Sequence, residues 1–254
     1  MSKAAALLFI LLCLFGFINP AFAQSPKKYL DSEIPEEDGT FELTKHPDMK
    51  VRVIVHKAKP TTSELLSCSV SDPDSNSVTN PAGWHLADGS WHYLLNTSST
   101  PLNLSSIATN AFNSWSATNV GKHVTFVSDG TTNISQKGFD NKNIIAWGRT
   151  QGTALAVTYT WYYTANNQVA EEDTIFNKKF SWNWTPYSAS ACVSSNSYDA
   201  QNILTHELGH WMGLDDEYAG SYVNNTMYGY GAKAEIKKDT LTTGDINGIQ
   251  AIYP

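Results

Sequence analysis

Charge is scarce in this sequence, and no cluster of basic residues occurs. Only 16% of the 254 residues are charged, which is unlike a disordered chain or a coiled coil. The formal net charge is −7, so we expect no nucleic-acid partner, because an acidic surface repels phosphates. Apolar and aromatic residues are plentiful instead, at 41% and 12%. This composition supports one good core or two small ones and is typical of a secreted enzyme.

Long apolar runs are also lacking, except at the N-terminus. Lys3 precedes the apolar run 4–17, and the small residues Ala21 and Ala23 lie where a signal peptidase would cut. We therefore predict a signal peptide over residues 1–23 and a secreted or extracytoplasmic protein without membrane attachment after its removal. A retained anchor is the alternative, although the run is shorter than the roughly 20 residues that span a bilayer.

Few cysteines remain once this leader is removed. Cys13 lies inside the leader, which leaves Cys68 and Cys192. Two cysteines in an oxidising compartment most simply form one disulfide. Such a bridge would stabilise the fold by typically about 2–4 kcal/mol.

The stretch that carries chemistry reads H-E-x-x-H-x-x-G-x-x-D and begins at His206. In a helix, His206 and His210 lie one turn apart on the same face and can hold one metal ion together. Glu207 can then reach a water on that metal, and Gly213 can end the helix and turn the chain back. Asp216 offers a third, oxygen ligand. Two histidines, a carboxylate and an open fourth position are typical of a catalytic zinc site.

The extended motif resembles the metzincin clan of zinc peptidases, and within it the matrixins. Met227 follows in a segment similar to the methionine turn of that clan. Residues 241–254 resemble the last helix of matrixin catalytic domains, and residues 170–177 resemble the strand before the active-site helix. The resemblance covers residues 84–254. It implies an α+β fold with a twisted mixed sheet, an active-site helix and a C-terminal helix.

The resemblance also implies the roles of the site residues. The protein would be a zinc-dependent endopeptidase acting on protein or peptide substrates, with His206, His210 and Asp216 as metal ligands. Glu207 would be the general base, and Met227 an apolar floor beneath the metal. Most matrixins have histidine where this chain has Asp216, whereas snapalysin-like metzincins use aspartate there. Asp215 and Glu217 are the alternative third ligands.

Two further expectations follow from the resemblance. Matrixin propeptides use an unpaired cysteine as a temporary zinc ligand, and Cys68 lies upstream of the catalytic segment, as such a switch would. Its neighbours lack the flanking arginine and glycine of that motif, so the disulfide and the switch both stay open. Related peptidases often bind structural Ca²⁺, and Asp129, Asp140 and Asn141 lie in oxygen-rich loops.

The sequence is divided into three predicted segments, and its apolar periodicity predicts the helices and strands. Residues 1–23 are the signal peptide, 24–82 an N-terminal extension or short propeptide, and 83–254 the catalytic domain. A helix is expected after Pro101, with a buried stripe of Leu104, Ile107, Ala108, Ala111, Phe112 and Trp115. A second is expected after Asp199, which can cap it. The last is expected from Thr242, with a capping box to Asp245 and a packing face of Ile246, Ile249 and Ile252. In the resembled family, the region of the strands predicted over 153–163 and 169–176 lies beside the cleft, and an extended substrate pairs with its edge. The strands are expected at 50–56, 91–95, 124–127, 144–147, 153–163 and 169–176.

Five histidines remain outside the motif, and none has ligand spacing. We interpret each as a surface residue or as a structural residue with its hydrogen bonds satisfied. They are His46, His56, His85, His92 and His123.

Two rival functions differ in chemistry. One is a secreted, non-catalytic metal-binding or protein-binding module on the same scaffold. The other is a different zinc hydrolase with Glu235 as the third ligand. We expect a monomer.

Overall fold

The structure is a computed structural model, and it describes residues 27–59, 73–97, 101–184 and 196–254. The predicted signal peptide, Cys68 and Cys192 lie outside these residues. In the described part of the chain, no helix is long and apolar enough to cross a membrane.

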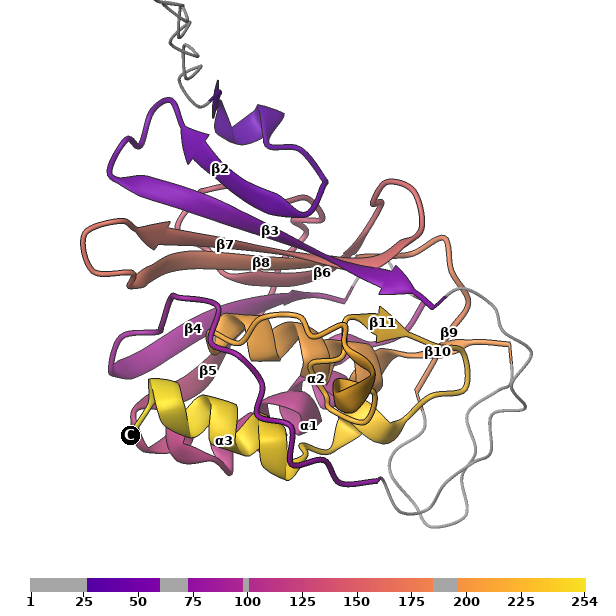
Figure 1. Ribbon diagram of the computed structural model, residues 1–254. Coiled ribbons are helices and arrows are strands. Elements are labelled where there is room, and N and C mark those ends of the chain that lie inside the picture. The colour runs from indigo at the N-terminus through magenta and orange to yellow at the C-terminus, as the bar shows by residue number, and fades with distance from the viewer. Residues whose placement is uncertain (1–26, 60–72, 98–100, 185–195) are drawn as a thin grey trace, which may run out of the picture.

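One mixed sheet forms the centre of the described chain (Figure 1). Its strands follow the order β1-β2-β3-β7-β8-β6-β4-β5, and β11 pairs with β3. β4, β5, β6 and β8 run parallel to one another, while β7 is antiparallel to both β8 and β3. The strands are β1 (Lys28–Tyr29), β2 (Gly39–Leu43), β3 (Met49–Ala58), β4 (Gly89–Asn96), β5 (Val124–Thr131), β6 (Ile144–Gly148), β7 (Ala154–Tyr163), β8 (Val169–Asn177) and β11 (Tyr230–Gly231), with β9 (Trp182–Asn183) and β10 (Tyr198–Asp199) paired separately.

Among the residues that the structure describes, three α-helices lie together on one side of this sheet (Figure 1). They are α1 (Leu104–Ser116), α2 (Ala200–Trp211) and α3 (Thr243–Ile252). Single 3₁₀ turns occur at η1 (Asp31–Glu33), η2 (Asn119–Lys122), η3 (Gly220–Tyr222) and η4 (Lys237–Asp239). The α+β fold with an active-site helix and a C-terminal helix is therefore confirmed.

Two hydrophobic cores cover the central strands of the sheet, one on each face. On the helix side, Trp115 of α1 and Trp211 of α2 belong to a large core. On the other face, Val51, Val53 and Tyr159 form a second core with residues of the N-terminal extension. The alternation of Leu155, Val157, Tyr159 and Trp161 predicts a half-buried strand over 153–163. This expectation is wrong, because β7 is covered on both sides.

The helices α1 and α3 largely follow their sequence patterns. All six residues of the predicted apolar stripe on α1 are buried, and Asn103 caps its start. α3 has the predicted capping box between Thr242 and Asp245. Its expected packing face is wrong at Ile246, which is 41% exposed. Asp245 is buried instead, because its carboxylate accepts a hydrogen bond from Thr79 Oγ1 at 2.7 Å.

Three successive acidic residues of β8, Glu171, Glu172 and Asp173, are buried. The carboxylate of Glu171 accepts hydrogen bonds from the backbone N–H groups of Asp140 and Asn141. Burial nevertheless raises the pKa of Glu171 to about 7, and it also raises the pKa values of Glu172 and Asp173. The folded chain therefore holds protons on this strand that the unfolded chain releases.

This proton retention predicts a stability that falls with rising pH. For Glu171, the folded pKa of about 7 exceeds the unfolded value of 4.5, so its contribution is fully present below pH 4.5 and is lost as the pH rises through 7. We expect urea denaturation between pH 5 and pH 8 to show a decreasing free energy of unfolding. Because Glu171 binds a single proton, it can contribute at most about 1.4 kcal/mol per pH unit to the slope of the free energy of unfolding against pH. Glu171→Gln should flatten the slope, and an unchanged slope would contradict this assignment.

Candidate metal centre

α2 presents both motif histidines at the centre of the molecule. Asp199 caps the helix, and its side chain accepts hydrogen bonds from the N–H groups of Gln201 and Asn202 at 2.9 Å. The predicted cap is thereby confirmed. One turn apart, the rings of His206 and His210 have centroids 4.8 Å from each other, and both side chains are fully buried.

A tight turn at Gly213 ends α2 and reverses the chain. Gly213 N–H donates to His210 O at 3.0 Å, and Leu214 N–H donates to Gly209 O at 2.9 Å, which is the Schellman pattern. Gly213 has φ +96°, and a Cβ placed on it would lie 2.3 Å from Trp84 O. Only glycine fits this turn without displacing its neighbours.

The turn brings Asp216 back to the two histidines. Asp216 Oδ1 lies 3.1 Å from His206 Nε2 and 3.6 Å from His210 Nε2, and the two Nε2 atoms are 3.2 Å apart. Ligands that surround a zinc ion tetrahedrally, with bonds of about 2.0–2.2 Å, are about 3.3–3.5 Å from one another. These three atoms therefore fit one such ion.

Hydrogen bonds orient each of the three side chains. His206 Nδ1 lies 2.7 Å from Thr226 O, and His210 Nδ1 lies 2.9 Å from Leu214 O. Because a carbonyl can only accept, each Nδ1 carries the proton and each Nε2 keeps a free lone pair. Tyr218 donates to Asp216 Oδ2 at 2.9 Å, while Oδ1 has no hydrogen-bond partner. Burial also lowers the pKa of His206 to about 4, so its ring is neutral at physiological pH.

The two alternative third ligands point elsewhere. Glu217 Oε1 accepts hydrogen bonds from the backbone and the side chain of Asn80, at 2.8 and 2.7 Å. Asp215 Oδ1 lies 3.8 Å from Arg52 Nη2, and the Asp215 side chain is 42% exposed. Of the three consecutive acidic residues, Asp216 is the one whose carboxylate meets the histidines.

Glu207 lies beside this group and is fully buried. Its Oε2 accepts a hydrogen bond from Thr158 Oγ1 of β7 at 2.6 Å, whereas its Oε1 has no hydrogen-bond partner. Burial raises the pKa of Glu207 to about 8. The side chain thus has one anchored oxygen and one free oxygen.

Met227 lies beneath the helix turn that joins the two histidines. A Cβ on Gly209, one residue before His210, would be 2.2 Å from Met227 Sδ and 2.9 Å from Trp115. The sulfur therefore packs directly against the helix backbone. Thr226, the residue before Met227, supplies the carbonyl that orients His206.

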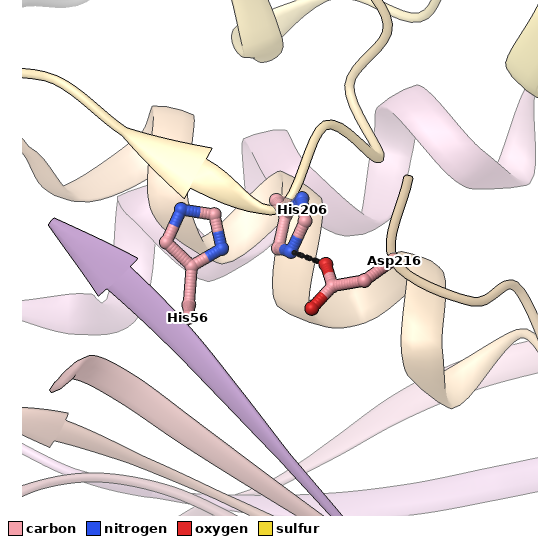
Figure 2. A group of neighbouring side chains, drawn as sticks. All are labelled: His56, His206 and Asp216. Atoms are coloured by element: carbon pink, nitrogen blue, oxygen red, sulfur yellow. Dashed lines mark ion pairs between the residues drawn. The ribbon is translucent and has the colours of Figure 1, made fainter. Parts of the chain in front are cut away.

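Sequence reasoning missed His56, which lies at the same place. His56 is fully buried, and neither of its ring nitrogens has a hydrogen-bond partner, so the expectation of a surface or satisfied residue is wrong for it. It reaches from β3 toward His206, with the ring centroids 4.0 Å apart (Figure 2). One atom from each of His56, His206 and Asp216 lies within 4.8 Å of the others. His56 Nδ1 is also 3.6 Å from Glu207 Oε1.

Comparison with known proteins bears on the C-terminal two thirds of the chain. The family model for matrixins, Peptidase_M10, matches residues 84–254. This range begins just before β4 and includes α2, Asp216 and Met227. Comparison with curated proteins finds no match.

Proposed function

Because the chain belongs to the matrixin family of zinc-dependent endopeptidases, we propose that it is a secreted peptidase whose zinc is held by His206, His210 and Asp216. The observation that supports these ligands is the spacing of 3.1–3.6 Å among the two Nε2 atoms and Asp216 Oδ1. Both histidines already donate from Nδ1, so their lone pairs converge on one point. Calcium at Asp129, Asp140 or Asn141 stays a prediction.

Zinc bound there supplies a Lewis acid for the scissile carbonyl and for the attacking water. Glu207 acts as the general base: its free Oε1 takes the proton from that water and passes it to the leaving amine. Thr158 holds the other oxygen and thereby fixes the carboxylate plane. A raised pKa suits a group that must both accept and return a proton near neutral pH.

A peptidase assay tests this proposal. The purified exported chain is incubated with denatured casein before and after limited trypsin treatment, with the trypsin quenched before the assay. We expect cleavage that 1,10-phenanthroline abolishes and added zinc restores. Glu207→Gln should bind zinc as the wild type does and lower turnover by roughly 100-fold or more, because it removes the general base.

Two results would favour the rival functions. A folded chain that takes up zinc but cleaves nothing in either preparation would favour the non-catalytic binding module. A zinc site that needs Glu235 would favour a different hydrolase. Glu235 Oε1 instead lies 3.4 Å from Asn202 Nδ2, and its Oε2 lies 3.7 Å from Lys237 Nζ. These contacts support Asp216 as the acidic ligand.

A further inference from the structure

β3 lies outside the residues that match the matrixin family, yet it joins the sheet of that family. The matched residues supply β4, β5, β6, β7 and β8, and within this set β7 is the last strand. β3 pairs antiparallel with β7 over nearly its whole length, from Met49 opposite Tyr163 to Lys57 opposite Ala154. A strand of the N-terminal extension therefore covers the edge that an extended peptide would use.

The end of β3 is held from its other side as well. Tyr230 and Gly231 of β11 pair parallel with Lys57 and Ala58, and Lys59 N–H donates to Gly231 O at 2.8 Å. β11 lies beside the end of β3 (Figure 1). The end of the strand thus lies between β7 and β11 and bonds through its backbone to both, as a peptide held in a groove by strand addition would.

Arg52 adds a side-chain contact between β3 and the metal-site loop. It pairs with Asp38 of the N-terminal extension, and its Nη2 lies 3.8 Å from Asp215 Oδ1, the residue before Asp216. The extension therefore contacts both the edge strand and the loop that carries the acidic ligand.

His56 lies at this doubly held end and points into the metal centre (Figure 2). It shares the helix-side face of β3 with Ile54, because side chains alternate along a strand. Burying a polar atom without a hydrogen bond is unfavourable, and both nitrogens of His56 are in this state. The imidazole of His56 is fully buried and has no hydrogen bond, and one of its nitrogens lies within 4.8 Å of one atom each of His206 and Asp216, so these three residues could hold a metal ion.

We propose that β3 is a built-in occupant of the substrate site and that His56 is the fourth protein ligand of the zinc. This inference rests on the proposed function. Four protein ligands close a tetrahedral site, whereas catalysis needs one position open for water and the scissile carbonyl. The chain that retains β3 is therefore latent, and loss of residues 24–59 activates it. His56 therefore acts as the temporary zinc ligand, the role that the family resemblance suggested for Cys68.

X-ray absorption spectroscopy at the zinc edge counts the imidazoles around the metal in the intact chain. We expect three imidazoles in the wild type and two in both His56→Ala and His56→Phe, the latter keeping the ring volume without a ligand atom. His92→Ala is the matched control, because His92 is exposed and contacts Asp129; it should keep three. Two imidazoles in the wild type, unchanged in the His56 variants, would overturn the proposal.

Peptidase activity gives the second reading. Limited proteolysis that removes residues 24–59, verified by mass spectrometry, should raise casein cleavage at least tenfold over the intact chain. Equal turnover by the intact chain, or a fall on removal, would overturn the latency while leaving zinc-dependent cleavage, and hence the proposed function, standing. A folded chain that takes up no zinc would overturn both.

Discussion

Asp216→Ala lowers the zinc affinity of the chain by at least about 100-fold, whereas Asp215→Ala and Glu217→Ala leave it within a few-fold of the wild type. The expectation follows from the geometry, because Asp216 Oδ1 is the acidic oxygen within 3.6 Å of both histidine nitrogens. Loss of a residue that only orients a ligand already costs about 10–100-fold in metal affinity, so loss of the ligand itself costs more. Competition with a chromophoric zinc chelator measures the three affinities.

The two neighbours are matched controls, because each removes one carboxylate from the same loop. Glu217→Ala also removes two hydrogen bonds from Asn80, so its thermal stability is measured alongside its affinity. Asp216→His should bind zinc again, since histidine is the residue that most matrixins carry there. A negative ligand makes the metal a weaker Lewis acid, so the wild type should work at higher pH than this variant. Loss of zinc in a neighbour variant, with Asp216→Ala unaffected, would contradict the ligand assignment.

The local parts of the site could be predicted from the sequence. The spacing of His206 and His210 sets their relation once a helix forms, and Asp199 signals where that helix begins. Gly213 signals where it ends, because the turn needs a positive φ. These inferences involve residues within one or two helical turns of each other. The stripe on α1 and the capping box on α3 were predictable for the same reason.

The contacts between distant segments could not be predicted in this way. The alternation of Val51, Val53 and Val55 predicts a strand, but it does not say which strand pairs with it. The pairing of β3 with β7 is what brings His56 to His206, 150 residues later in the chain. The same pairing, together with the second core, buries β7 on both faces. A histidine at the end of an apolar strand has no spacing that marks it as a ligand.

The turn after α2 also predicts the largest loss of stability. In Gly213→Ala, the new Cβ would lie 2.3 Å from Trp84 O, a backbone atom that cannot rotate away. The positive φ costs about 1–2 kcal/mol for a residue with a Cβ, and overpacking adds about 1–3 kcal/mol. We therefore expect the free energy of unfolding to fall by about 2–5 kcal/mol. Chemical denaturation of the zinc-free proteins measures this difference.

Gly83→Ala separates the two contributions, because Gly83 has φ +101° and a Cβ added to it would meet nothing within 4 Å. This control should lose only the conformational cost of about 1–2 kcal/mol. Zinc affinity should also fall in Gly213→Ala, because the same turn carries Asp216 back to the histidines, and it should be unchanged in Gly83→Ala. Equal losses of stability in the two variants, with zinc affinity intact in both, would show that the carbonyl of Trp84 yields and that the position of Asp216 does not depend on this turn.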